Sequence, residues 1–196
     1  MIALKEYFKE NPVITNRDAD NIGIGRHVLS DLASQGKIER IRPGVYQKSG
    51  EILDDFVLIS SNRDRVVFSH QSALYLHDLS DRVPNIFNIS VPQGYNASHI
   101  KKGYANLKIH YIKKDLYPIG ISEIRTPLGN VVQVYDVERS ICDIIVDREK
   151  IDAQIFVGAL SSYFKGKNKD LRKLIKYGRQ FGIEEEIRRY VAFFRD

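Results

Sequence analysis

Residues 17–46 read RDADNIGIGRHVLSDLASQGKIERIRPGVY, and this stretch decides the fold of the N-terminal part of the chain. It predicts a helix, a tight turn and a second helix. Thr15 precedes the first helix, where its hydroxyl can accept a hydrogen bond from the amide of Asp18. Two glycines in residues 22–25 supply the turn, because glycine readily adopts the left-handed backbone that ends a helix.

The sequence after the turn predicts a helix with an apolar inner face and a polar outer face. Val28, Leu29 and Leu32 recur at helical spacing, and Gly36 ends the helix. The residues on its outer face are Arg26, His27, Ser30, Asp31 and Ser34.

A two-stranded ribbon follows over residues 38–47. Its strand-type residues fold back around Pro43-Gly44. A further helix over residues 2–11, which Pro12 ends, comes before Thr15. Together these elements are typical of a winged helix-turn-helix domain.

This domain predicts binding to double-stranded DNA, because a recognition helix meets base edges near its N-terminal end. Arginines in the ribbon flank that helix and are expected on phosphates or in the minor groove. The predicted DNA-binding residues are Arg17, Arg26, His27, Ser30, Lys37, Arg40 and Arg42. The alternative is a solvated helix face in a winged helix that binds protein.

The charge distribution favours a polyanionic partner. The net charge is +5, and residues 151–196 carry 10 basic and 6 acidic side chains, whereas residues 51–100 carry 3 and 6. One winged helix buries too little surface for high affinity, so we expect two copies on an inverted repeat.

Composition excludes several classes of protein. With 43% hydrophobic and 28% charged residues the sequence is that of a globular protein, and no apolar run is long enough to span a membrane. The N-terminus predicts no signal peptide, and the single cysteine, Cys142, cannot form an intrachain disulfide. A reducing cytoplasm is therefore the expected compartment.

The expected fold class is mixed α/β (α+β), with two domains. Residues 1–48 form the winged helix-turn-helix, and a short polar break at 48–50 leads to a C-terminal domain over residues 51–196. Its predicted strands, at residues 65–68, 85–92, 107–112, 122–125 and 131–135, come before most of its helices, which indicates an antiparallel or mixed sheet. Its predicted helices are 51–61, 71–79, 136–146, 152–164, 169–181 and 183–194.

Three segments together resemble the AbiEi antitoxins of type IV (abortive-infection, AbiE) toxin–antitoxin systems. They are the winged-helix segment 29–46, the segment 69–77 (SHQSALYLH) and the segment 134–143 (VYDVERSICD). Asp78 departs from the family pattern, since a glycine is expected at that helix end.

The resemblance implies a repressor of its own operon that also serves as the antitoxin in a phage-resistance system. The implied toxin is a nucleotidyltransferase-like protein of the same operon, which forms no stable complex with the antitoxin. A ligand-responsive repressor without antitoxin role is the first alternative, and a winged-helix nuclease or nucleotidyltransferase is the second.

The residues themselves predict no enzyme, no cofactor and no metal. His70 and His77 are seven positions apart on a helix, about 10.5 Å along its axis, too far to share an ion. Cys142 lies among isoleucines, which favours a buried inert thiol over a nucleophile. Asp143 and Asp147 are expected in a surface ionic network with Arg139, Arg148 and Lys150, rather than in a metal site.

The helix over residues 169–181 predicts a second basic surface. Its apolar positions share one face, and the opposite face carries Arg172, Lys173, Lys176 and Arg179. Such a stripe could contact phosphates of DNA or RNA and serve antitoxicity, or it could be solvated surface only.

Overall fold

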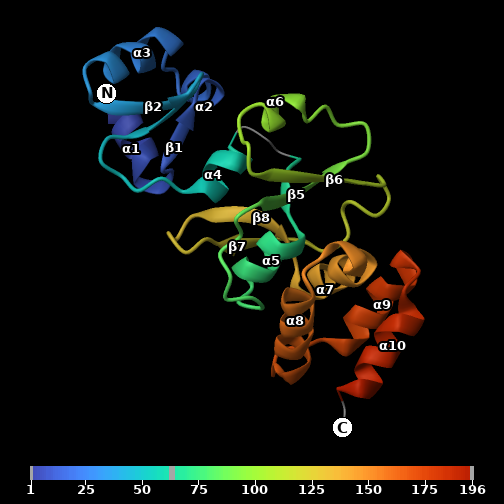
Figure 1. Cartoon of the computed structure of the whole chain (residues 1–196). Coiled ribbons are helices and arrows are strands. Elements are labelled where there is room, and N and C mark those ends of the chain that lie inside the picture. The colour runs from blue at the N-terminus through green and yellow to red at the C-terminus, as the bar shows by residue number, and fades with distance from the viewer. Residues whose placement is uncertain (1, 62–64, 195–196) are drawn as a thin grey trace. The chain divides into compact units, whose positions relative to one another are not determined.

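The computed structural model describes residues 2–61 and 65–194, which form two compact units (Figure 1). The first unit comprises residues 1–64 with the turn 126–131, and the second comprises 65–125 with 132–196. The first unit contains the elements α1 (Ile2–Glu10), β1 (Val13–Thr15), α2 (Asn16–Asn21), α3 (Arg26–Ser34), β2 (Ile38–Arg42), β3 (Val45–Lys48) and α4 (Asp55–Ser60).

The first unit contains the predicted winged helix. Thr15 caps α2 by accepting from the Asp18 amide at 3.2 Å, while the Asp18 carboxylate accepts from the Thr15 amide at 2.9 Å. The ribbon β2–β3 is confirmed, and β1 adds a third antiparallel strand in the order β1-β3-β2. Three residues are too few to show a period of two, so the sequence did not predict β1.

The core of the first unit lies under α3. Leu29 is fully buried and Leu32 is nearly so, and they lie in one cluster with Ile14, Ala19, Ile38 and Tyr46. This cluster fixes α3 against the sheet and leaves its polar face outward, as the apolar spacing predicts.

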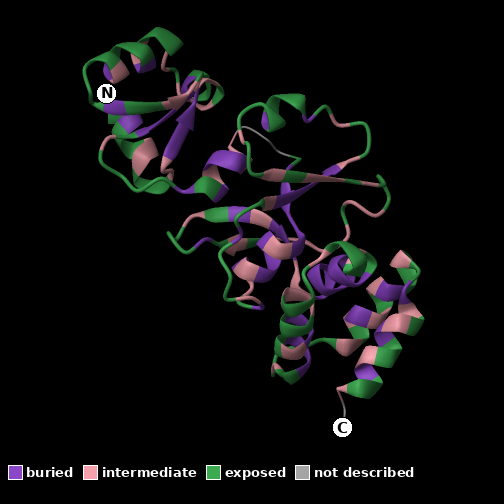
Figure 2. Cartoon of the chain, viewed as in Figure 1, coloured by how far each residue is buried: buried purple, intermediate pink, exposed green. Residues whose placement is uncertain are grey.

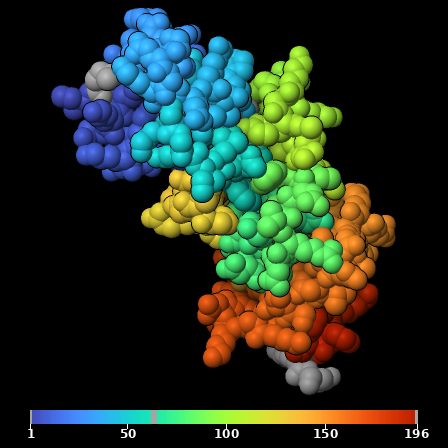
Figure 3. All heavy atoms as spheres, turned by 60° about the vertical axis from the view of Figure 1, so that its left-hand side comes forward, coloured from blue at the N-terminus to red at the C-terminus, as the bar shows by residue number. Residues whose placement is uncertain are grey.

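Helix α4 is shorter than the predicted helix over 51–61 because Asp54 starts it. One Asp54 carboxylate oxygen accepts from the amides of Phe56 and Val57. The other accepts from Thr126 Oγ1 and Asn130 Nδ2, both at 2.7 Å. Figure 3 shows the turn around residue 128, in yellow, against the cyan segment that holds Asp54. The functional boundary predicted at residues 48–51 stays a prediction.

The second unit is built on a mixed five-stranded sheet, which confirms the expected fold class. It contains β4 (Val67–Phe68), α5 (His70–Leu76), β5 (Phe87–Pro92), α6 (Ser98–Lys101), β6 (Leu107–Ile112), β7 (Ile121–Arg125), β8 (Val131–Tyr135), α7 (Val137–Val146), the 3₁₀ turn η1 (Arg148–Lys150), α8 (Ala153–Lys165), α9 (Leu171–Phe181) and α10 (Glu184–Phe193). The strand order is β6-β5-β4-β8-β7, with β4 antiparallel to β5 and parallel to β8, and β5 parallel to β6.

The helices of the second unit surround α7. Asp136 caps α7 by accepting from the Arg139 amide at 2.8 Å, and α7 contacts α5, α8 and α9. Figure 2 shows α7 mostly buried, while α9 and α10 alternate between buried and exposed positions. Four-residue α6 was not predicted, since it is too short for a helical period to appear.

Asp78, which stands where the family pattern has a glycine, follows the end of α5. The φ of Asp78 is +55°, the left-handed conformation for which a glycine is expected at that helix end. Aspartate is among the residues that tolerate this region, so the turn forms with Asp78 in place.

None of the helices in the described ranges, 2–61 and 65–194, combines the length and apolar character needed to cross a membrane.

Candidate DNA interface

Helix α3 presents a polar face at the surface of the first unit. Arg26, His27 and Ser30 are exposed, while the opposite face is held by Leu29 and Leu32. Gly25 is the N-cap, and a Cβ there would lie 2.5 Å from the His27 ring. The glycine therefore allows the His27 ring to fold back over the start of the helix.

The Arg26 guanidinium is paired with Asp20 of α2. Its Nη2 lies 3.0 Å and its Nε 3.3 Å from the same Asp20 oxygen. The Arg26 side chain is nevertheless 69% exposed. Exposed ion pairs contribute only about 0–1 kcal/mol, so a phosphate or a guanine could replace Asp20 at little cost.

The wing is fixed by its turn. Gly44 has a φ of +74° and its carbonyl oxygen accepts from the Asn16 amide at 2.9 Å. A Cβ on Gly44 would lie 3.0 Å from Asn16 Nδ2, so the turn lies directly against the start of α2. Arg17, the next residue of α2, is exposed beside it.

The two wing arginines have different surroundings. Arg40 is exposed, as is Lys37 at the start of the ribbon, and neither makes an ion pair within the described part of the chain. Arg42 is half-buried, and its Nη2 donates to the Leu58 carbonyl oxygen at 2.9 Å and to Ser61 Oγ at 2.8 Å. The β2–β3 ladder shifts its register between Arg40 and Arg42.

The predicted basic stripe on α9 is divided by acidic partners from other helices. Lys173 Nζ lies 3.0 Å from Asp136 and 3.2 Å from Glu138. Tyr177 also donates to Asp136, at 3.0 Å. Burial, followed by the charge of Asp136 and this hydrogen bond, raises the pKa of Tyr177 to about 12. Lys173 therefore joins α9 to the start of α7.

The remaining three cations of the stripe are exposed. Arg179 pairs with Glu184 of α10 at 2.7 Å. Arg172 and Lys176 make no ion pair within residues 2–61 and 65–194. The surface available for phosphate on this helix is therefore centred on Arg172 and Lys176.

Arg139 lies in the core, which corrects its expected place in a surface network, whereas Lys150 pairs with Asp147 at 2.9 Å as expected. It is fully buried, and its Nε donates to Asp143 at 2.9 Å. Its Nη1 donates to the carbonyl oxygens of Leu116 and Ile119. The guanidinium also lies over the rings of Tyr135 and Phe181, at 4.0 and 4.2 Å. The segment 134–143 therefore has a structural role that the sequence did not reveal, because its partners come from distant segments.

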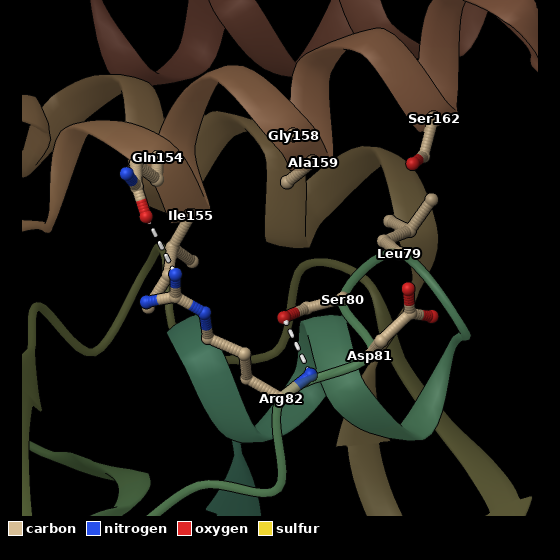
Figure 4. A pocket seen from close by; sticks show the side chains of 9 residues that line it. All are labelled: Leu79, Ser80, Asp81, Arg82, Gln154, Ile155, Gly158, Ala159 and Ser162. Carbon is tan, nitrogen blue, oxygen red and sulfur yellow. Dashed lines mark hydrogen bonds between the residues drawn. The ribbon is translucent and has the colours of Figure 1, made fainter.

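Two further features of the second unit are the buried thiol of Cys142 and a pocket between residues 79–82 and α8. Cys142 is fully buried, and burial raises the pKa of its thiol well above the usual range, which fits the predicted inert role. The pocket has a volume of about 250 Å³, and Arg82 crosses it to donate to Gln154 at 2.6 Å (Figure 4). Its lining contains Ser80, Ser162 and the carboxylate of Asp81, but no histidine or cysteine.

The first unit is similar to a known protein family. Residues 3–47 match the family model described as "Transcriptional regulator, AbiEi antitoxin". They span α1 to β3, including both helices of the helix-turn-helix and the wing. Among curated proteins, none matches this sequence.

A solved structure has a similar fold over nearly the whole chain. It is the crystal structure of the RV2827C protein from Mycobacterium tuberculosis, with a TM-score of 0.62 over 97% of this chain and 79% of that chain. The two sequences are 13% identical, so this likeness establishes the fold alone.

Proposed function

We propose, on the premise that residues 3–47 belong to the AbiEi antitoxin family of transcriptional regulators, that this chain represses its own operon. It does so by binding inverted repeats in promoter DNA. Helix α3 enters the major groove with Arg26, His27 and Ser30, and the wing places Arg40 on an adjacent phosphate or in the minor groove.

One observation carries this proposal: the outer face of α3 is polar and exposed at its N-terminal end, beside a wing that is fixed by its own turn. The positive groups Arg17, Lys37 and Arg40 are exposed on the same unit. They supply sequence-independent attraction to phosphate, while α3 supplies the base contacts.

The proposal extends to antitoxin function. The second unit counters a nucleotidyltransferase-like toxin encoded in the same operon, in the cytoplasm and without a stable complex. This part rests on the family of the first unit and on a second unit whose basic helix face, Arg172 and Lys176, has no assigned role.

The DNA-binding test is footprinting of the full chain on the DNA upstream of its gene. We expect two protected half-sites on one face of the duplex, and loss of both with the double variant Arg26→Ala/Arg40→Ala. Lys5→Ala, which removes an exposed charge from α1, should bind as the wild type does. A single unpaired site at saturation would contradict the inverted repeat.

The antitoxin test is co-expression with the product of the neighbouring toxin gene. Growth should be restored by the full chain and lost with residues 1–50 alone, and the two proteins should not co-purify. Incubating the purified chain with labelled nucleic acid and Mg²⁺ or Mn²⁺ tests the alternative of an enzyme, for which cleavage or nucleotide addition would be the sign.

A further inference from the structure

Two histidines and one aspartate, far apart in sequence, meet in the second unit. His70 begins α5, His110 lies in the middle of β6, and Asp147 follows the last residue of α7. Their three ligand atoms all lie within 4.8 Å of one another. We propose that His70, His110 and Asp147 bind a zinc ion. This proposal goes beyond DNA binding and antitoxicity, and its test requires no DNA.

The distances fit a site that is close to tetrahedral. Asp147 Oδ2 lies 3.5 Å from His70 Nε2 and 3.8 Å from His110 Nδ1. Ligands at the usual Zn–N and Zn–O distances of about 2.0–2.1 Å are separated by about 3.4 Å in a tetrahedron. The two imidazole rings are stacked at 13° to one another, so one ring must turn about its Cβ–Cγ bond before both nitrogen lone pairs point at one ion.

Hydrogen bonds orient the His110 ring toward that ion. Its Nε2 lies 3.0 Å from Asn88 Oδ1, while Asn88 Nδ2 donates to the Ile86 carbonyl oxygen at 3.0 Å. The amide nitrogen is thus already used as a donor, so Asn88 Oδ1 accepts from the Nε2–H of His110. This leaves the Nδ1 lone pair of His110 for the metal, as is usual for zinc-binding histidines.

His70 has a comparable support. Its Nδ1 lies 3.0 Å from Ser69 Oγ, which also accepts from Ser90 Oγ at 2.9 Å. The Ser69 oxygen can accept from the Nδ1–H of His70, which leaves Nε2 for the metal. The His70 backbone has a φ of +48°, and its ring lies parallel to that of His110 with the centroids 3.6 Å apart. Residues held in this backbone region concentrate at ligand sites.

The carboxylate and the surroundings also fit. Lys150 Nζ holds Asp147 Oδ1 at 2.9 Å, which leaves Oδ2 for the ion. A cavity of about 190 Å³ is lined by His70, Asn88 and Lys150, so solvent reaches the His70 side of the site. Two imidazoles and one carboxylate favour zinc over Mg²⁺, which prefers oxygen ligands.

The sequence offered no sign of this site because its ligands are 37 or more positions apart along the chain. His70 and His77 cannot share an ion, and the structure pairs His77 with the Tyr135 carbonyl oxygen at 2.7 Å instead. The prediction of no metal rested on pairs of residues within one helix. The pairing of Ser90 in β5 with His110 in β6 instead brings His110 beside α5.

The test is zinc titration of the full, untagged chain after treatment with a chelator. We expect one Zn²⁺ per chain by calorimetry, a thermal midpoint that rises with zinc concentration, and a tetrahedral d–d spectrum when Co²⁺ replaces zinc. Mg²⁺ should produce none of these effects. A wild-type chain that binds no zinc, or binds it without a rise in midpoint, would overturn the proposal.

Variants locate the site. His110→Gln and Asp147→Asn should each lower zinc affinity at least about tenfold, since even a partner that orients a ligand contributes about 10–100-fold. His99→Gln and Asp115→Asn, which change exposed residues of the same types, are the matched controls. If His110→Gln does not fold, Asn88→Ala keeps the ligand and removes its orienting hydrogen bond, together with the Asn88 bond to the Ile86 carbonyl oxygen, and should cost about 10–100-fold in zinc affinity. Unchanged zinc affinity in folded His110→Gln or Asn88→Ala would overturn the assignment.

Discussion

The Arg26 guanidinium lies 3.0 Å from the Asp20 carboxylate, so the arginine that we propose reads DNA is paired with the helix before it. The pair is exposed on both sides. It therefore keeps Arg26 oriented without holding it strongly, and Asp20 becomes a competitor of any DNA acceptor for the same guanidinium.

Replacing Asp20 tests this competition. Asp20→Asn should raise DNA affinity by up to about fivefold, because an exposed pair contributes about 0–1 kcal/mol and its carboxylate also repels phosphate. Fluorescence anisotropy on operator and random duplexes would measure it. Glu6→Gln, which breaks the exposed Glu6–Lys9 pair of α1, is the matched control and should change neither affinity. Equal affinities for the wild type and Asp20→Asn would mean that Asp20 does not compete with DNA for Arg26.

Arg26 itself should affect specificity more than general affinity. Arg26→Ala should cost about 1–3 kcal/mol on the operator and relax the preference at one base pair. Arg26→Lys keeps the charge but loses the bidentate geometry, so it should restore binding to random DNA and not the base preference. Selection from random duplexes would measure both. Equal losses on operator and random DNA would assign Arg26 to phosphate.

How far the sequence predicts this protein depends on whether the relevant partners are neighbours along the chain. The Thr15 cap, the faces of α3 and the ranges of β6 and β8 follow from local spacing and are confirmed. Lys173 was expected on a basic surface, and its partners Asp136 and Glu138 come from α7, more than thirty positions away. Tertiary contacts of this kind leave no mark in the periodicity of a single helix.

Arg42 should act on the stability of the first unit. Arg42→Ala loses hydrogen bonds from a charged donor to Leu58 and Ser61, which we expect to cost about 1.5–3 kcal/mol in the free energy of unfolding. Arg40→Ala should instead lower DNA affinity without loss of stability. The slope of log affinity against log salt concentration should fall by about one, as expected for the loss of one phosphate contact. Urea unfolding and salt-dependent anisotropy separate the two effects. A stable Arg42→Ala with a reduced salt slope would place Arg42 on DNA.

The same contacts set an expectation for the N-terminal fragment. A fragment of residues 1–50 lacks Leu58 and Ser61, which accept hydrogen bonds from Arg42, so it should retain only weak DNA binding. A fragment of 1–61 keeps them and should bind more tightly, measured by anisotropy on the same duplex.

The basic face of α9 can be tested without disturbing its core. Arg172→Glu/Lys176→Glu should leave the fold intact, since both side chains are exposed, and should lower the salt slope of operator binding or abolish toxin neutralisation. Lys113→Glu/Lys114→Glu reverses two exposed charges elsewhere on the second unit and is the control. If the α9 variant matches the wild type in operator affinity, salt slope and neutralisation, this face is solvated surface only.

The strongest effect on stability is expected at Arg139. Its guanidinium is fully buried, holds Asp143 at 2.9 Å and ties the loop at Leu116 and Ile119 to α7. Removing one partner of a buried ion pair leaves the other charge uncompensated, so Arg139→Met should cost about 3–5 kcal/mol in the free energy of unfolding. Arg139→Met/Asp143→Leu removes both charges and should recover part of that loss, which a double-mutant cycle by urea unfolding would quantify. If the free-energy costs of Arg139→Met and Asp143→Leu simply add, the ion pair contributes nothing beyond the packing of its two side chains.

Because Arg139 lies in the second unit, Arg139→Met should impair toxin neutralisation while leaving intact the unit that carries α3 and the wing.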